Sequence, residues 1–295
     1  MLKIIPPLYK DEIIYSWYAR YHTFSGNRNT SQTILDLNNR NSRYTNFKDC
    51  FDGLVNICNH LPKEFNITPS TIIKLHTAYP IYELLYNRHS NNIIHNFNKV
   101  SPSICYFSNL KICKKCLTEQ YDKYGETFLN KYYQNTYIHY CHIHYEPLLE
   151  YYKKNDDRNF SDINRMPPSN FSFKVPNKLL SYENHFIAIS NLNRDIMNHT
   201  ANDLDLINLR KVYLYRLKDL GFINNRRFKS SSFLPEFKSY YTQDFLNFFN
   251  ITTNNWISNI FKEYDNIPPI KHYLMIIFLF GSFQIYFLIV KTYAL

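Results

Sequence analysis

Glycine is scarce in this chain, with five glycines among its 295 residues. Barrels and propellers depend on many tight turns that favour glycine, so this shortage argues against them and favours a mainly α-helical fold. The chain also lacks the phosphate-binding and nucleophile motifs G-x-x-x-x-G-K-S/T, G-x-G-x-x-G and G-x-S-x-G. The commonest nucleotide-binding and hydrolase signatures are therefore excluded.

Acidic residues are also in short supply, since 24 Asp and Glu stand against 34 Lys and Arg. The formal net charge is +10 and the pI is about 9.1, which favours a polyanion as partner. Charge alone does not distinguish DNA from RNA or from an anionic membrane. Hydrophobic residues make up 45% of the chain, enough for a sizeable core, and the length favours two domains.

The start of the chain, MLKIIPPLYKDE, lacks the long apolar run and small-residue cleavage site of a signal peptide. We therefore expect a cytoplasmic protein whose six cysteines stay reduced. Clustered cysteines in such a protein favour metal binding over disulfide bonds.

The strongest local motif is C-x2-C followed after 24 residues by C-x2-H. A gap of two residues lets one tight knuckle present two donors to a tetrahedral zinc ion, and two knuckles complete its shell. We predict one structural Zn²⁺ per chain and a zinc-finger insert of Cys3His type. The predicted ligands are Cys113, Cys116, Cys141 and His144. His139 and His142 leave the fourth ligand open, and buried reduced thiols are the other interpretation.

Apolar residues at helical spacing predict a helix over residues 11–24 that ends at Gly26. Its expected buried face consists of Ile14, Trp17, Tyr18, Tyr21 and Phe24. Acidic residues open this helix and Arg20 and His22 close it, as the helix dipole favours. We expect further helices at residues 30–37, 47–59 and 68–75.

Changes in composition divide the chain into four segments. Residues 1–100 form an N-terminal helical region, and residues 101–150, rich in Cys, His and Tyr, form the zinc-binding insert. Residues 151–202, which are polar at first and contain paired prolines, form a linker or irregular segment. Residues 203–295 form a basic helical domain.

This last domain carries a candidate DNA-binding module. Residues 203–229 contain seven Lys and Arg against three Asp, within a predicted helix over 203–220, Gly221 and a basic segment. Serines 230–232 then stand where they could cap a second helix, which gives a helix-turn-helix-like pattern. The candidate DNA contacts are Arg226, Arg227, Lys229, Arg210 and Lys211. A solvated charged face on a core helix explains residues 210–218 equally well.

Residues 273–290 include no formal charge over 18 positions, the lower limit for a membrane-spanning helix. Gly281, Ser282 and Gln284 interrupt this stretch, so a buried core helix fits it as well. A C-terminally membrane-anchored protein and a zinc-dependent enzyme acting on nucleic acid are the alternatives to a DNA-binding protein.

Several motifs follow one another in the order of a known family. They are Pro7, Asp11-Glu12, Tyr15-Ser16-Trp17, Arg20-Tyr21-His22, His76-Thr77-Ala78-Tyr79-Pro80, Cys113-x2-Cys116, Tyr124-Gly125-Glu126, Gln134 and Cys141-x2-His144. In this order and approximate spacing the chain resembles the TnsD/TniQ family of transposon target-site selection proteins. It departs from the family's pattern at Lys114, where proline is usual, and at Tyr133-Gln134, where His-Gln is usual.

The resemblance implies a non-enzymatic adaptor without a small-molecule substrate. Such a protein selects a target by binding DNA or an RNA-guided effector complex, and it recruits the transposon's AAA+ ATPase regulator. The resemblance also implies a cytoplasmic, nucleoid-associated protein in a bacterium. In this family the apolar segment 273–290 is a core helix, so no membrane contact is expected.

Overall fold

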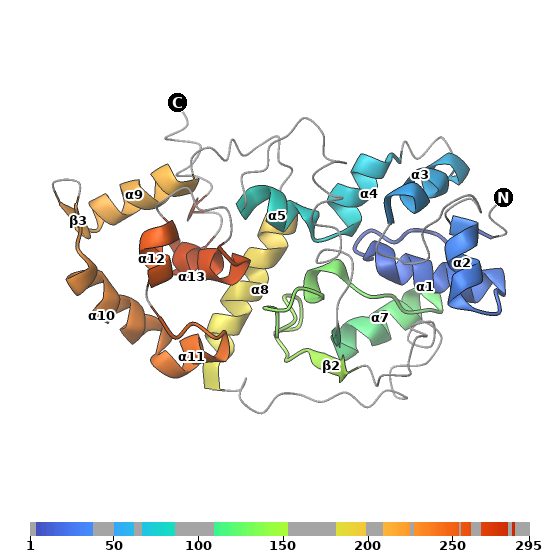
Figure 1. The fold of residues 1–295 in the computed structure, drawn as a ribbon. Helices are drawn as coiled ribbons and strands as arrows, with labels where there is room; N and C mark the ends of the chain where they lie inside the picture. Colours follow the sequence, from blue (N-terminus) through green and yellow to red (C-terminus); the bar gives the residue numbers. More distant parts are fainter. Residues whose placement is uncertain are drawn as a thin grey trace. The chain divides into compact units, whose positions relative to one another are not determined.

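The computed structural model describes residues 4–37, 50–61, 67–85, 109–152, 181–198, 209–224, 227–253, 255–260, 267–282 and 285–286. The chain divides into two compact units (Figure 1). Unit 1 is Met1–Tyr79 with Ser90–Lys178, and unit 2 is Pro80–His89 with Leu179–Leu295. Helices dominate the described part of both units, which confirms the mainly α-helical fold.

Unit 1 begins with four helices: α1 (Ile14–Ser25), α2 (Thr30–Leu37), α3 (Cys50–His60) and α4 (Pro69–His76). All four overlap the ranges in which helices were predicted. Gly26 ends α1 in the left-handed conformation with φ of 66°, and the Thr68 side chain caps α4 by accepting from the backbone N–H of Thr71.

The prediction for α1 is wrong in two details. The helix starts at Ile14, so the acidic pair Asp11-Glu12 precedes it and does not form its first turn. Phe24 is 44% exposed, whereas Trp17 and Tyr21 are fully buried as expected. Helix α1 also buries Tyr15, Ser16 and Arg20, so it is buried on more sides than an amphipathic helix.

The second half of unit 1 contains strand β1 (Asn109–Ile112), helix α7 (Lys114–Tyr124), a 3₁₀ turn (Lys131–Tyr133) and strand β2 (Leu149–Tyr152). The two strands pair antiparallel, with Asn109 opposite Tyr152 and Ile112 opposite Leu149. One hydrophobic cluster joins this region to the start of α1; it contains Ile13, Tyr15, Leu110, Ile112, Leu117 and Leu129. The predicted insert therefore shares a core with the N-terminal region and is no separate domain.

Unit 2 contains helices α5 (Tyr79–Leu85, whose first residue belongs to unit 1), α8 (Glu183–Asn198), α9 (Leu209–Asp219), α10 (Ser230–Tyr241), α11 (Gln243–Phe248), α12 (Asn255–Ile260) and α13 (Pro269–Phe280). Helix α8 lies inside residues 151–202, so the prediction of an irregular segment is wrong there. Its apolar residues at helical spacing, Phe186, Ile189, Leu192 and Ile196, are all buried.

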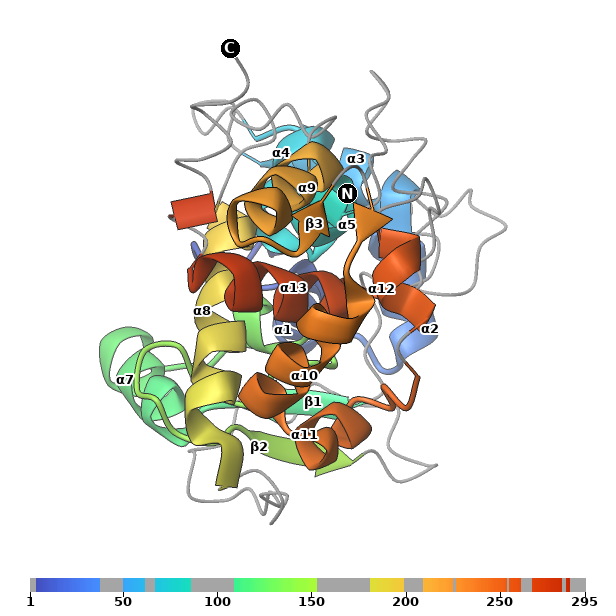
Figure 2. The same ribbon diagram turned by 90° about the vertical axis from the view of Figure 1, so that its left-hand side faces the viewer.

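Helix α13 lies at the centre of unit 2 and contacts both α8 and α9 (Figure 2). The Tyr273 hydroxyl donates to Asn193 Oδ1 of α8 at 2.9 Å, and the Tyr241 hydroxyl donates to the Leu274 carbonyl at 2.7 Å. Helix α13 is buried along most of its length and ends at Gly281, which confirms a core helix over the first part of the apolar segment. Among the described residues, none of the helices has the length and apolar character needed to cross a membrane.

The predicted helix-turn-helix-like region consists of α9, a short hairpin and α10. Strands β3 (Ile223–Asn224) and β4 (Arg227–Phe228) pair antiparallel, a hairpin that the sequence did not predict. Lys229 is the N-cap of α10 and makes no side-chain cap, so the expected capping by serines 230–232 is wrong. The Ser232 hydroxyl donates backwards to the Lys229 carbonyl at 3.1 Å.

Candidate metal centre and its buried support

Three cysteines and one histidine of unit 1 converge at one point. Cys113 is the N-cap of α7 and Cys116 lies in its first turn, while Cys141 and His144 belong to the turn before β2. Tyr145 closes that turn in the left-handed conformation with φ of 54°, and its N–H donates to the Cys141 carbonyl at 3.0 Å. The four potential ligand atoms all lie within 4.8 Å of one another.

The spacing of these atoms suits a tetrahedral metal ion. Cys116 Sγ lies 3.8 Å from Cys141 Sγ, and His144 Nδ1 lies 3.4 Å from the Sγ atoms of both Cys113 and Cys116. Ordinary zinc bond lengths at tetrahedral angles give edges of roughly 3.8 Å between sulfurs and roughly 3.6 Å between sulfur and nitrogen. The cluster could therefore hold one metal ion with four protein donors.

Backbone and side-chain groups support the sulfurs. The N–H groups of Ile143 and His144 donate to Cys141 Sγ at 3.4 and 3.3 Å. Hydrogen bonds with Cys113 and Cys116 lower the pKa of Cys141, so one thiolate is favoured at this position even before a metal binds. Thiolate is the form of cysteine that binds metal.

A second layer of polar residues surrounds the cluster. The Tyr133 hydroxyl lies 3.1 Å from the Sγ atoms of both Cys116 and Cys141, where a phenol O–H can donate to thiolates. Glu119 Oε1 lies 2.9 Å from His144 Nε2, on the side of the ring opposite the sulfurs. A carboxylate behind a histidine ligand fixes the tautomer and orientation of the ring.

The two alternative histidine ligands lie outside the cluster. His139 Nδ1 lies 3.4 Å from Glu150 Oε1, and burial lowers the pKa of His139 to about 4. The His142 ring packs against the rings of Tyr132 and Tyr133, with centroids 4.9 and 5.6 Å away. His144 is thus the histidine that faces the three sulfurs.

Glu146 stands two residues after His144, which is the H-x-E spacing found in zinc deaminases. Its Oε1 lies 2.5 Å from Lys115 Nζ, and both side chains are exposed. A carboxylate engaged in a surface ion pair with lysine is not arranged as the proton carrier of a metal-bound water.

A buried lysine supports the loop that leads to the cluster. Lys111 Nζ donates to the carbonyls of Asn135, Thr136 and Ile138 at 3.1, 2.9 and 2.7 Å. Burial lowers the pKa of Lys111 to about 8, and Glu150 opposes this effect. Gln134 holds the backbone of the same residue, because its side-chain amide donates to the Lys111 carbonyl at 2.8 Å. The loop geometry is therefore set by side chains, because regular secondary structure is short here.

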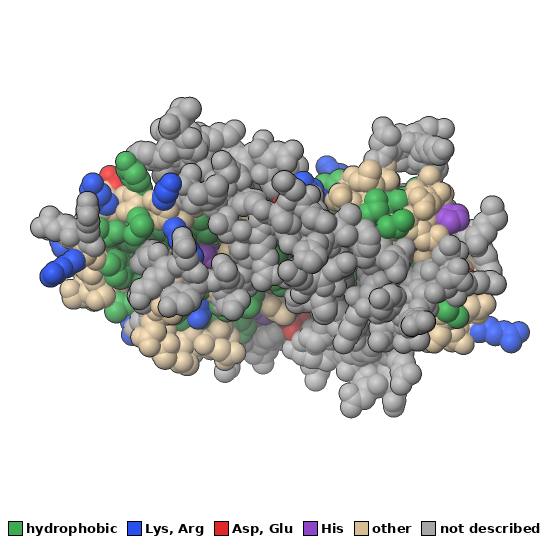
Figure 3. Space-filling view, turned by 45° about the horizontal axis from the view of Figure 1, so that its top comes forward, with side chains coloured by type: hydrophobic (Ala, Val, Ile, Leu, Met, Phe, Trp, Pro, Cys, Tyr) green, Lys and Arg blue, Asp and Glu red, His purple; other side chains and the backbone are tan. Residues whose placement is uncertain are grey.

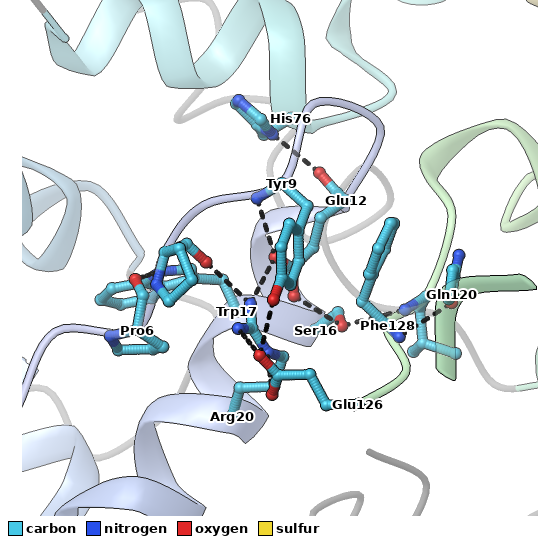
Figure 4. Close-up of polar contacts among 12 residues, drawn as sticks. Pro6, Tyr9, Glu12, Ser16, Trp17, Arg20, His76, Gln120, Glu126 and Phe128 are labelled. Atoms are coloured by element: carbon cyan, nitrogen blue, oxygen red, sulfur yellow. Dashed lines mark hydrogen bonds and ion pairs between the residues drawn. The ribbon is translucent and has the colours of Figure 1, made fainter. Parts of the chain in front are cut away.

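The largest polar feature that sequence reasoning missed is centred on Arg20 (Figure 4). Its side chain is fully buried, and Nη1 donates to Glu12 Oε2 at 2.8 Å. Nη2 and Nε donate to the two carboxylate oxygens of Glu126 at 2.5 and 3.0 Å, a bidentate ion pair. The sequence predicted only that Arg20 closes a helix. In the structure its ion pair with Glu126 joins α1 to the segment after α7.

The neighbours of Arg20 complete this buried network. The Tyr9 hydroxyl donates to Glu126 Oε1 at 2.7 Å, and the Tyr9 ring lies 4.4 Å from the guanidinium carbon. The Ser16 hydroxyl donates to Glu12 Oε1 at 2.9 Å and accepts from the Leu129 N–H at the same distance. Burial raises the pKa of Glu12 to about 7, and Arg20 opposes this effect.

The candidate DNA-contact residues lie in unit 2. Lys211 on α9, Arg227 on β4 and Lys229 before α10 are exposed, and Arg210 is half-buried. Arg226 lies outside the described residues.

Comparison with known proteins assigns both units. A family model described as TniQ matches residues 3–148, and one described as Tn7-like transposition protein D matches residues 189–294. No curated protein matches the chain. The first match covers the metal cluster and the Arg20 network, and the second covers most of unit 2. The chain belongs to the TnsD/TniQ family of transposition target-site selection proteins.

Proposed function

We propose that this protein is a non-enzymatic adaptor that selects a transposition target by binding DNA through unit 2. The observation that carries the proposal is the match of residues 189–294 to Tn7-like transposition protein D, in a region where Lys211, Arg227 and Lys229 are exposed. Exposed cations are the groups that neutralise DNA phosphates. Arg210 and Arg226 are the remaining candidate contacts.

Direct DNA binding is tested by gel shift with duplex DNA from the element's insertion locus. A direct reader binds this DNA and loses affinity steeply as salt concentration rises, because phosphate contacts release counterions. Binding that is absent, or unaffected by salt, contradicts direct reading. An adaptor to an RNA-guided complex then becomes the better account, and it predicts co-purification with that complex.

We further propose that the Cys3His cluster holds one Zn²⁺ in a structural role. Its donor set of three sulfurs and one imidazole nitrogen, with tetrahedral edges, suits zinc better than oxygen-preferring cations. When bound, zinc would supply a fixed cross-link between the start of α7 and the turn before β2. Four protein donors leave no position for water, which favours support of the fold over catalysis.

Metal analysis of purified protein tests this site. One zinc per chain is expected in the native protein, and Cys113→Ser or His144→Ala should lose it. Cys58→Ser is the matched control, because Cys58 is half-buried on α3 and belongs to no described metal cluster. Full folding of the native chain without bound metal contradicts the proposal.

Unit 1 is the proposed binding partner of the transposon's AAA+ ATPase regulator. The TniQ match covers this unit, and the zinc site with the Arg20 network would hold its surface in one shape. The AAA+ ATPase regulator of the same transposon should co-purify with the native chain and fail to co-purify with His144→Ala. Equal recovery of the ATPase with both proteins contradicts this assignment.

A further inference from the structure

Helix α9 presents a stripe of four side chains to solvent: Lys211, Leu214, Tyr215 and Lys218. Tyr215 is 54% exposed and Leu214 is 39% exposed, and both lysines are exposed. At roughly 100° of rotation per residue the four positions fall within an arc of roughly 100° on one side of the helix. We call this set the α9 stripe.

The other side of α9 fixes the direction of the stripe. Val212, Tyr213 and Leu217 are buried in the core of unit 2. The Arg216 side chain donates from Nε to the Leu279 carbonyl of α13 at 3.0 Å and from Nη1 to Asp219 at 2.6 Å. The helix therefore cannot rotate without breaking core contacts, and the stripe stays turned to solvent.

The surroundings of the stripe are basic. The described residues between 209 and 241 include seven Lys and Arg against two acids, Asp219 and Glu236. Asp219 is already paired with Arg216. Figure 3 shows Lys and Arg side chains beside exposed hydrophobic ones in the part of unit 2 that contains α9 and the hairpin. The Phe222 and Phe233 rings pack 5.2 Å apart, and the Lys229 N–H donates to the Phe222 carbonyl at 2.8 Å, which holds this hairpin in place.

We propose that the α9 stripe faces the major groove of the target DNA with the helix axis across the groove, so that Lys211 and Lys218 reach phosphates on opposite strands and Tyr215 with Leu214 point at base edges. A helical rise of 1.5 Å per residue separates the two lysines along the axis by roughly 10 Å, close to the roughly 12 Å width of the groove that α9 crosses. Apolar side chains between them meet the thymine methyl groups that line this groove. This proposal rests on the proposed function, because it names the surface that reads DNA.

Charge complementarity selects DNA as the occupant of the stripe. A stripe that packed against a protein interior would not carry a lysine at each end without acids on the same face. Phosphates on the two strands provide two anionic rows, and the thymine methyl groups between them offer apolar contacts, which matches the order of side chains along a helix that crosses the groove. An acidic protein partner is the competing occupant, and it predicts no effect of the stripe on DNA binding.

The experiment measures binding of the full chain to a labelled random-sequence duplex pool and to duplexes enriched from that pool by repeated selection. Lys211→Glu with Lys218→Glu should weaken binding to both and reduce the slope of log K against log salt by about two. Tyr215→Ala with Leu214→Ala should leave the slope unchanged and reduce the preference for selected over random duplexes by about tenfold.

Two matched controls lie on α7 in unit 1: Lys123→Glu, an exposed lysine, and Tyr121→Ala, a tyrosine that is 39% exposed. They should leave DNA binding near that of the native chain. The stripe proposal is overturned if its variants bind like the native chain, or if Lys123→Glu lowers the slope as much per charge. Failure of the native chain to bind any duplex contradicts direct DNA reading itself, so the two failures are distinguishable.

Discussion

The two units are stabilised by different kinds of side chain. Unit 1 buries charges: Arg20, Lys111 and Lys131 are each at most 4% exposed, and each meets carboxylates or carbonyls. No lysine or arginine among the described residues of unit 2 is buried. There the core contains aromatic rings packed against one another, such as Phe186, Tyr241 and Phe245.

This difference explains why unit 1 requires specific residue types at more positions than unit 2. A buried charge is tolerated only with its own partner at the right distance, so each member of the Arg20 network demands specific residue types. An aromatic core accepts many rings of similar volume at a given position. The strands and the 3₁₀ turn near the metal cluster are only three or four residues long, so polar cross-links hold the loops between them.

Removal of the central cation should produce the largest single-residue loss in unit 1. Arg20→Met leaves Glu12 buried beside Glu126 without a positive partner and should lower the free energy of unfolding by about 3–5 kcal/mol. Arg194→Met in unit 2 breaks a half-exposed pair with Asp195 and should cost less than about 1 kcal/mol. Denaturant unfolding measures both losses in free energy. Equal losses would contradict the expectation that the buried ion pairs of Arg20 stabilise the protein more than the pair of Arg194 with Asp195.

Loss of one buried aromatic ring should destabilise unit 2 in a corresponding way. Phe245 is fully buried and contacts the rings of Phe186, Tyr241 and Phe249, so Phe245→Ala should cost about 3 kcal/mol. Leu220→Ala, at a position that is 42% exposed, should change stability by about 0.5 kcal/mol or less. Chemical denaturation read by Trp256 fluorescence in a Trp17→Phe background reports this unit, and a minor effect of Phe245→Ala contradicts the ring-based core.

Acid should affect the two units differently. Burial lowers the pKa of His272 in unit 2 to about 3 from an ordinary 6.5, so the unfolded chain takes up a proton that the folded unit rejects. As the pH falls from 6.5 towards 3, this residue removes up to about 1.4 kcal/mol of stability per pH unit. Its replacement in His272→Gln should flatten that dependence.

Unit 1 contains groups with opposite effects between pH 4.5 and 6.5. Burial lowers the pKa of both His76 and His139 to about 4, which makes stability rise with pH. The pKa of Glu12 is raised to about 7, so the folded unit keeps a proton that the unfolded chain releases, and stability falls with pH. Glu12 therefore offsets one of the two histidines of unit 1, whereas burial lowers the pKa of both His272 and His185 in unit 2. We expect a flatter pH profile for unit 1, followed through Trp17 in a Trp256→Phe background; a steeper profile than that of unit 2 would be inconsistent with these pKa shifts.

The smallest expected effect concerns the second layer of the metal cluster. Tyr133→Phe removes one hydroxyl that reaches two sulfurs and should cost about 0.5–1.5 kcal/mol while the fold persists. Extraction of zinc by a competing chelator should become faster, because two thiolates lose a donor. Tyr132→Phe is the matched control, since the Tyr132 hydroxyl bonds to Asp11 at 3.3 Å and not to sulfur. Identical extraction rates in the two variants would assign Tyr133 to packing alone.

The sequence predicts the parts of this fold that depend on local patterns. Apolar spacing locates α1 and α9, the ranges expected for α2 to α4 also contain helices, and glycines in the left-handed conformation end α1 and α9 as expected. The cysteines that the paired knuckle spacing selected also lie together with His144 in the structure. The spacing alone does not determine which of His139, His142 and His144 faces the sulfurs, because that depends on how the turn at Tyr145 directs each ring.

The parts that the sequence did not predict depend on distant contacts. Arg20 and Glu126 are 106 positions apart, so a basic residue at a helix end gave no sign of a buried ion pair. Helix α8 was missed because the polar residues before it suggested a linker. The hairpin β3–β4 has only two residues per strand, too short for an alternating pattern to identify.

We expect a bound metal to stabilise unit 1 alone, while unit 2 is stable through its own aromatic core. Hydrogen exchange of the full chain, measured by mass spectrometry before and after zinc chelation, tests it most directly. The account predicts faster exchange in peptides from residues 109–152 after chelation, unchanged exchange in α8 and α13, and recovery when zinc is returned. Unchanged exchange around the cluster, or an equal increase in both units, would contradict it.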